Sequence, residues 1–147
     1  REVILTKKLE AEGNVDFVIP GAACEGHALM KEVNFSYTFV NEHGICRTPG
    51  KYSGKSTSGV NAHGWFSYEL KCKPNSTNSL TVKAGADDGV IDFYVTVGEE
   101  RFTAHAEGAT PQEFHFTFDE RAGEENIRIR IDRMTASTPF IYEIKIS

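Results

Sequence analysis

The sequence predicts an all-β protein, an antiparallel β-sandwich with jelly-roll connections. Two observations support this fold class. From residue 64 onward, apolar and polar residues alternate in five separate runs, which is typical of strands with one buried face and one wet face. Turn-forming residues separate these runs, and no segment has a convincing helical period. The 147 residues suit one domain, residues 1–147, that can bury a core of its own.

The expected strands follow in chain order. Strand-like pieces occur at residues 3–9, 15–19 and 35–40, and the alternating runs lie at 66–72, 91–97, 114–118, 127–131 and 142–146. Turn chemistry marks residues 73–77, 87–89, 122–123 and 137–139, and residues 97–102 have the pattern of a tight hairpin. Nine or ten short strands with such turns are typical of a β-sandwich.

Residues 41–63 interrupt this pattern. They are rich in Gly, Ser, Thr and Lys, contain few apolar residues and show no periodicity. A loop of this length is uncommon inside a compact domain and usually has a function or is mobile. We therefore expect this segment to form a long polar loop that ends at the strand containing Trp65.

Trp65 is the only tryptophan in the chain. The parity of its strand places it on the polar side, opposite Phe66, Tyr68 and Leu70. Two interpretations remain open. Either the preceding loop covers the indole ring, or the ring is held out as a platform on which a sugar stacks, since indole combines a large apolar area with an N–H donor.

The net charge of the chain limits the kinds of binding partner, and the number of cysteines limits the possible disulfides. The formal net charge is -5, which argues against nucleic acid and anionic membrane as main partners. Three cysteines do not make a disulfide framework. Cys24 and Cys46 could pair in an oxidising compartment, whereas Cys72 falls on the apolar side of its strand and is expected to be buried.

Several segments resemble a known module. Gly64-Trp65-Phe66-Ser67-Tyr68-Glu69-Leu70, residues 80–82, residues 91–98 and the terminal 141–146 are similar to strands in the C-terminal β-sandwich of β-L-arabinofuranosidase-type glycoside hydrolases. Glu25, His27, Leu29 and Arg47-Thr48 also fit that layout, which spans about residues 25 to 147. The hairpin departs from the family pattern, because Val97-Gly98-Glu99 stands where the family has Val-Asp-Gly.

This resemblance implies a sandwich appended to a glycan-degrading enzyme, not an active enzyme. The family's catalytic chemistry lies in a separate helical barrel with a zinc-bound cysteine, and nothing here corresponds to that barrel. More broadly, the strand pattern resembles galactose-binding-like carbohydrate-binding modules. Such modules often hold a structural calcium with a glutamate near the C-terminus among its ligands, and Glu143 resembles that position.

The other candidate metal-binding and catalytic groups lack the spacing that such sites require. The five histidines have no metal-ligand spacing. His43, His63 and Cys46 lie near one loop and could meet a metal, but solvation is the better interpretation. Asp87-Asp88 and Glu99-Glu100 fall in expected turns rather than facing each other across a cleft, as a glycosidase requires. We predict no catalytic residue.

Two functional hypotheses follow. The first is a non-catalytic carbohydrate-binding module that binds plant-cell-wall-type polysaccharide or oligosaccharide, is joined to a catalytic domain in the same polypeptide, and works in an extracellular or periplasmic location. The second is a structural accessory domain that packs against a catalytic barrel and exposes an apolar patch without a ligand of its own. The ligand-binding residues predicted under the first hypothesis are Trp65, Tyr52, His63, Asn61, Arg47, Asp87, Asp88 and Tyr94.

Overall fold

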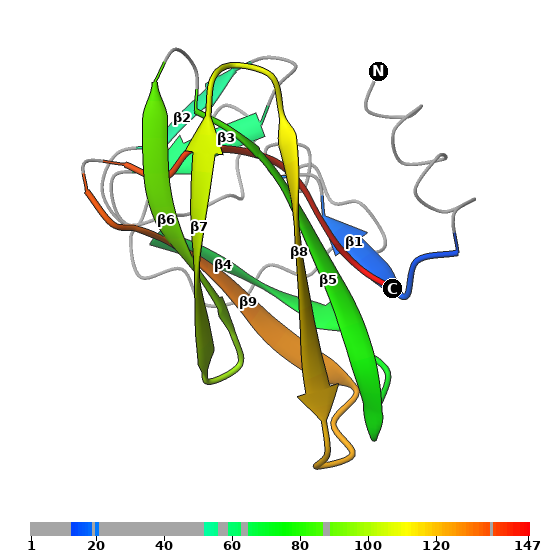
Figure 1. Ribbon diagram of the computed structural model, residues 1–147. Helices are drawn as coiled ribbons and strands as arrows, with labels where there is room; N and C mark the ends of the chain where they lie inside the picture. Colours follow the sequence, from blue (N-terminus) through cyan, green and yellow to red (C-terminus); the bar gives the residue numbers. More distant parts are fainter. Residues whose placement is uncertain are drawn as a thin grey trace.

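A computed structural model describes residues 13–18, 20, 52–55, 59–62, 65–86, 89–135 and 137–147. Within these ranges ten strands form two antiparallel sheets, which confirms the predicted all-β sandwich (Figure 1). No helix in the described part of the chain is long and apolar enough to cross a membrane. The predicted strands at 3–9 and 35–40, both Cys24 and Cys46, and His43 lie outside the described residues.

The larger sheet has six strands and the smaller sheet has four. The larger sheet has the order β2-β3-β10-β5-β8, with β1 also paired to β10; its members are β1 (Asp16–Val18), β2 (Tyr52–Lys55), β3 (Gly59–Ala62), β5 (Ser76–Gly85), β8 (Gln112–Glu120) and β10 (Phe140–Ile146). The smaller sheet has the order β4-β9-β6-β7; its members are β4 (Trp65–Lys71), β6 (Val90–Val97), β7 (Glu100–Glu107) and β9 (Asn126–Arg133).

The strand pairs are nested along the chain. The innermost pair is β6 with β7, followed outward by β5 with β8, β4 with β9 and β3 with β10. Folding such a nested set over on itself gives a jelly roll, as the sequence predicted.

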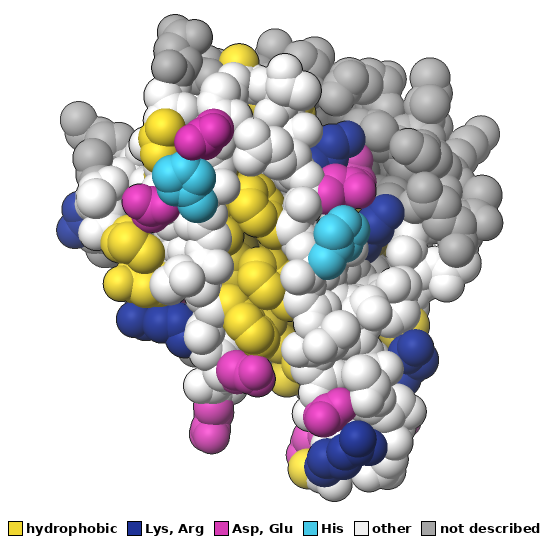
Figure 2. All heavy atoms as spheres, in the orientation of Figure 1, with side chains coloured by type: hydrophobic (Ala, Val, Ile, Leu, Met, Phe, Trp, Pro, Cys, Tyr) yellow, Lys and Arg dark blue, Asp and Glu magenta, His cyan; other side chains and the backbone are white. Residues whose placement is uncertain are grey.

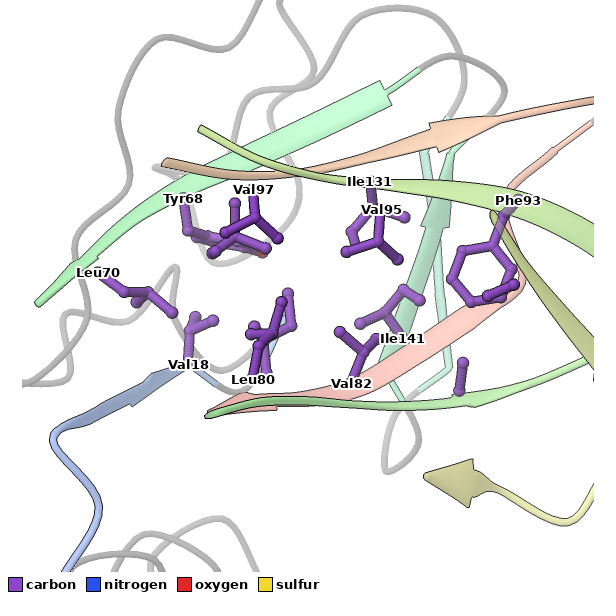
Figure 3. Close-up of a cluster of buried hydrophobic side chains, with 14 of the residues drawn as sticks. Val18, Tyr68, Leu70, Leu80, Val82, Phe93, Val95, Val97, Ile131 and Ile141 are labelled. Atoms are coloured by element: carbon purple, nitrogen blue, oxygen red, sulfur yellow. The ribbon is translucent and has the colours of Figure 1, made fainter. Parts of the chain in front are cut away.

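The core lies between the two sheets, and the predicted parity is confirmed. Phe66, Tyr68, Phe93 and Ile129 are buried, and Phe116 packs against this core with partial exposure. Figure 3 shows side chains of the two sheets meeting in one apolar layer. Cys72 is buried as expected, and this burial, together with the carboxylates of Glu120 and Glu124, raises the pKa of its thiol.

The tight hairpin between β6 and β7 is also confirmed. Val97 pairs with Glu100, so that Gly98 and Glu99 form a two-residue loop. Gly98 has a φ of 62°, which is a backbone conformation that glycine adopts without a Cβ penalty. A Cβ at this position would also lie 3.0 Å from Cδ1 of Ile127. Glycine is therefore favoured here by both backbone conformation and space.

Three details differ from the sequence-based expectation. Residues 41–63 are not a continuous loop, because β2 and β3 form a hairpin within them and β3 pairs with β10 through Val60 and Ile141. The predicted turn at 73–77 is too long, since β5 already begins at Ser76. The register of β10 shifts between Ile141 and Glu143, so that Ile141 rather than Tyr142 continues the buried face of Ile144 and Ile146.

Glu120 connects two turns at one end of the sandwich. Its carboxylate accepts hydrogen bonds from the backbone N–H groups of Asn75 at 2.8 Å, Gly123 at 2.9 Å and Ala122 at 3.0 Å. These bonds, that from Asn75 foremost, hold the pKa of Glu120 below its usual value because they favour the charged form. Glu120 thus ties the β4–β5 turn to the β8–β9 connection.

Candidate functional site

The outer face of the smaller sheet carries two of the predicted ligand-binding residues in one row. Trp65 pairs with Asp132 of β9, Asp132 pairs with Tyr94 of β6, and Tyr94 pairs with Thr103 of β7. Two strand spacings separate Trp65 from Tyr94, which corresponds to about 10 Å. Both rings are half-buried. The sheet therefore places two aromatic rings on one face with a carboxylate between them.

One face of the Trp65 ring is occupied by a guanidinium group. The Cζ atom of Arg130 lies 3.8 Å from the indole centroid, which is a cation–π arrangement. The Nε and Nη2 groups of Arg130 also donate hydrogen bonds to the two carboxylate oxygens of Asp132, both at 2.8 Å. Asp132 is buried, and its pairing with Arg130 meets the requirement that a buried charge be compensated.

The same arrangement recurs at Tyr94. The Cζ atom of Arg101 lies 4.2 Å from the centroid of the Tyr94 ring. Arg101 pairs with Thr96, two residues beyond Tyr94, just as Arg130 pairs with Ser67, two residues beyond Trp65. Both arginines thus reach their rings diagonally across a strand pair, which is within the range of long side chains in a sheet.

A histidine is bonded to two carboxylates further along the same face. Nδ1 of His105 lies 2.6 Å from Oδ1 of Asp92, and its Nε2 lies 3.0 Å from Oε1 of Glu107. The hydrogen bonds to Glu107 and then to Asp92 raise the pKa of His105 above its ordinary value. Figure 2 shows a histidine between two acidic side chains on this side of the molecule. The imidazole separates the carboxylates, so the three groups do not converge on one point.

Several connections meet at the end of the sandwich next to this histidine. The N–H of Gly89, just before β6, donates to the carbonyl of Ala86, just after β5, at 3.3 Å. Ala86 also donates to the carbonyl of Gly108 at 2.8 Å, and Gly108 donates to the carbonyl of Gly89 at 2.9 Å. Gly108, the residue after Glu107, therefore bonds to both Ala86 and Gly89, the described residues that flank positions 87 and 88.

The structure places the predicted site residues as follows. Trp65 and Tyr94 share the row described above. Tyr52 and Asn61 belong to the β2–β3 hairpin, where they pair with Ala62 and Ser53, and this hairpin runs into the residues before Trp65. Arg47, His63, Asp87 and Asp88 lie outside the described residues. Sequence reasoning missed Arg101, Arg130 and Asp132 as site residues. Alternation with Ile127, Ile129 and Ile131 placed Arg130 and Asp132 on the outer face, and Arg101 was assigned only to the hairpin at 97–102. No sequence signal gives the strand register that brings them to the rings.

Glu143, the predicted metal ligand, is buried on β10 with its Oε2 atom 3.6 Å from Nζ of Lys83. Calcium sites are built from several oxygen ligands around one point. In the described part of the chain, no group of three or more His, Cys, Asp or Glu side chains could hold a metal ion. A lysine ammonium beside Glu143 does not fit a calcium site at this carboxylate. The described residues thus do not supply the predicted ligand set.

Comparison with known proteins shows which solved structures have a similar fold. No protein-family model and no curated protein matches the chain. Among solved structures, the chain is similar to the CBM36-1 domain of a multidomain xylanase from the hindgut metagenome of Trinervitermes trinervoides, with a TM-score of 0.55 and 18% identity over 90% of this chain and 97% of that one.

Two further similar structures contain ligands. One is a carbohydrate-binding module, CBM36, in complex with calcium and xylotriose, with a TM-score of 0.52 and 16% identity over 66% of this chain and 88% of that one. The other is Xyl-CBM35 in complex with a disaccharide containing glucuronic acid, with a TM-score of 0.52 and 11% identity over 90% and 92% of the two chains.

These similarities establish the fold and not the ligand, because sequence identity is low. The chain has the β-sandwich fold of the CBM35 and CBM36 carbohydrate-binding modules. The resemblance to the C-terminal domain of β-L-arabinofuranosidase-type enzymes is not confirmed and stays a prediction.

Proposed function

We propose that this chain is a non-catalytic carbohydrate-binding module that binds plant-cell-wall-type polysaccharide or oligosaccharide and targets an attached glycoside hydrolase. The main support is its similarity to a CBM36 domain over nearly the whole of both chains. The proposal includes an extracellular or periplasmic location, where such polysaccharides occur. It does not extend to catalysis, since the sequence offers no catalytic constellation.

The row of Trp65, Asp132 and Tyr94 supports a glycan ligand on chemical grounds. A sugar has an apolar C–H face that packs on an aromatic ring and a rim of hydroxyl groups that bond to polar side chains. Arg130 and Arg101 each lie over one ring, so a sugar that stacks there uses the opposite ring face or displaces the guanidinium. The predicted residues Tyr52, Asn61, His63, Arg47, Asp87 and Asp88 complete the proposed binding set.

Calorimetric titration tests this proposal. We expect the wild-type chain to bind xylotriose or a disaccharide containing glucuronic acid, and expect Trp65→Ala to abolish binding without unfolding the domain. His115→Ala is the matched control, because His115 is exposed on the outer face of the other sheet. Arabinose- and galactose-containing oligosaccharides form a second panel. Failure of the wild type to bind any of these sugars would refute the proposal.

Any bound calcium is tested separately. The similar CBM36 structure contains calcium, and a structural calcium in this chain remains a prediction. A bound ion stabilises the folded state by mass action, so calcium added after chelation should raise the melting midpoint if a site exists. Because Glu143 faces Lys83, we expect Glu143→Gln to retain the wild-type response to calcium. Loss of the calcium response in Glu143→Gln would instead indicate that Glu143 is a calcium ligand.

One observation favours the alternative function, a structural accessory domain. Figure 2 shows apolar side chains gathered in a strip between the edges of β7 and β8. Phe102, Phe114 and Phe116 are partly buried there, and the Phe102 and Phe116 rings have centroids 4.9 Å apart. Such a strip suits packing against another folded domain. A well-folded wild type that binds no glycan would favour this function.

A further inference from the structure

The edge of the larger sheet at β8 has backbone groups that no described strand uses. Among the described strands, β8 is the last of its sheet and pairs with β5 alone. Ser79 of β5 bonds through both its N–H and its carbonyl to Ser147, on the side away from β8. Successive residues of a strand direct these groups to opposite sides, so Leu80 bonds instead to its partner Phe116 on β8. The alternate residues of β8 therefore direct their N–H and carbonyl groups to the second edge; these residues are Glu113, His115, Thr117 and Asp119.

The same residues carry charges in an order that is complementary to itself. They are exposed on the outer face of the sheet, and Arg121, directly after β8, is exposed as well. In one direction from Thr117 the outer face has His115 and then Glu113, and in the other direction it has Asp119 and then Arg121. Rotation by half a turn about Thr117 therefore places His115 over Asp119 and Glu113 over Arg121. Such a two-fold rotation relates the two members of an antiparallel pair of identical strands.

We propose that β8 pairs with β8 of a second copy of this chain, antiparallel and centred on Thr117, so that the larger sheet continues through a dimer. In this register Thr117 lies opposite Thr117 of the second copy, His115 opposite Asp119, and Glu113 opposite Arg121. Paired threonines and opposite charges at such positions stabilise neighbouring strands. The contact between His115 and Asp119 does not require an imidazolium, since a neutral imidazole keeps one N–H to donate.

The two neighbouring registers are less favourable. Outer-face residues must stay opposite outer-face residues, so the strands can slide only in steps of two residues. One step places Glu113 opposite Asp119 of the second copy, which brings two carboxylates together. A step in the other direction places His115 opposite Arg121 and leaves both carboxylates without a cation across the interface. The charges on the outer face therefore select the register centred on Thr117.

The inner face of β8 adds apolar contacts in the same register. Phe116 of one copy lies there opposite Phe118 of the other, and aromatic pairs across strands are stabilising. The strip that Phe116 forms with Phe102 and Phe114 runs beside this edge in each copy (Figure 2). The two-fold rotation brings the two strips toward each other. A separate folded domain could cover the strip, but only a second copy also matches the charge order on the outer face.

We expect this dimer to be weak, because its ion pairs are exposed and such pairs contribute little each. A dissociation constant of about 10 to 100 µM corresponds to an interface of this kind. The chain is then monomeric at the low protein concentrations of a fluorescence melt. Sedimentation velocity of the 147-residue chain without sugar, from about 1 µM to about 1 mM, should show the change from monomer to dimer. A wild type that stays monomeric throughout this range overturns the proposal.

Two single charge reversals test the register. Glu113→Arg puts two cations opposite each other, and Arg121→Glu puts two carboxylates opposite each other. Each variant should self-associate roughly tenfold more weakly, because both symmetry-related pairs become repulsive. An equimolar mixture of the two variants should recover the wild-type affinity, since each pair then joins opposite charges again. The control Arg133→Glu, an exposed reversal on β9 of the other sheet, should dimerise as the wild type does.

The variant Thr117→Pro tests the backbone pairing independently of charge. The N–H of Thr117 is directed to the second edge, so proline removes no bond to β5 there. This variant should keep the far-UV circular dichroism and the melting midpoint of the wild type but remain monomeric. A dimer that survives in folded Thr117→Pro, or charge reversals that associate as the wild type does, would overturn the proposal. If Thr117→Pro does not fold, the charge reversals and their mixture decide alone. None of these measurements depends on glycan binding, so failure of the proposed function leaves their result unchanged.

Discussion

Arg130 lies over the ring of Trp65 while bonding to both carboxylate oxygens of Asp132. Because Trp65 is the only tryptophan, tryptophan fluorescence reports on the surroundings of this one ring, which include the Arg130 contact. We expect Arg130→Ala to shift the emission spectrum and to lower the free energy of unfolding by more than about 1 kcal/mol, the size of a partly exposed cation–π contact, because the buried Asp132 also loses its guanidinium partner. Chemical denaturation followed by fluorescence measures both. Arg121→Ala, which removes an exposed partner of Asp119, is the control and should change neither.

The substitution Phe66→Ala tests how the core is packed. Its side chain is fully buried and packs edge-to-face on Tyr68, with ring centroids 5.8 Å apart. Phe66→Ala should reduce the free energy of unfolding by roughly 3 to 5 kcal/mol, through lost transfer energy and the cavity left behind. Val90→Ala, at a residue that is 55% exposed, should remain within about 0.5 kcal/mol of the wild type in the same denaturant titration. A loss below about 1 kcal/mol at Phe66 would contradict its placement.

The two-residue loop between β6 and β7 gives a third prediction. Gly98→Ala should destabilise the domain by about 1 to 2 kcal/mol, because an L-residue is strained at a φ of 62° and the new Cβ approaches Ile127. Gly89→Ala is the matched glycine substitution, since Gly89 lacks a positive φ and has no atom within 4 Å of the added Cβ. Thermal melts compare the two variants, and equal midpoints would argue against the described turn.

The hydrogen bonds of Glu120 predict that the stability of the fold decreases at acidic pH. Because its pKa is lower in the folded protein than its usual value of 4.5, the ionised carboxylate stabilises the fold above that pH, and this contribution is lost as pH falls through the folded-state pKa. Glu120→Gln should therefore melt several degrees below the wild type at neutral pH. The difference should shrink as the pH is lowered beneath about 4.5.

Glu113→Gln is the control for this comparison, because Glu113 is an exposed glutamate on the same strand. It should follow the wild type at every pH. A constant difference between wild type and Glu120→Gln down to strongly acidic pH would show that the carboxylate charge does not tie the two turns together.

The sequence predicted the strands whose faces differ most in polarity. In β4 and β6 the alternation from Phe66 to Leu70 and from Phe93 to Val97 follows the pleat without interruption, and burial follows the same parity except at Ser67, which is buried on the outer side of β4. The β2–β3 hairpin was missed because its residues, such as Ser53, Gly54 and Asn61, carry no apolar alternation. Its pairing depends on β10, which lies about eighty residues further along the chain.

Two other features depended on information that a single strand does not contain. The bulge at Tyr142 follows from how β10 pairs with β5, where the Tyr142 ring lies over Gly85, close to the position a Cβ would take there. The contact between Arg130 and Trp65 likewise follows from the register of β9 on β4. Both residues were correctly expected on the outer face, but only the register makes them neighbours. The sequence therefore predicted the face of the candidate site but not its pairings.

The central place of β10 constrains the order in which the chain can fold during synthesis. One edge of β10 pairs with β5, while its other edge pairs with β3 through Ile141 and with β1 through residues 144–146. β1 and β3 thus precede β10 in the chain, and β1, and the second edge of β3, can pair only when residues 140–146 leave the ribosome. Pairings between distant parts of a chain form slowly. Until then, the β2–β3 hairpin and the inner nested pairs, such as β6 with β7, can form, whereas β1 has to wait for β10.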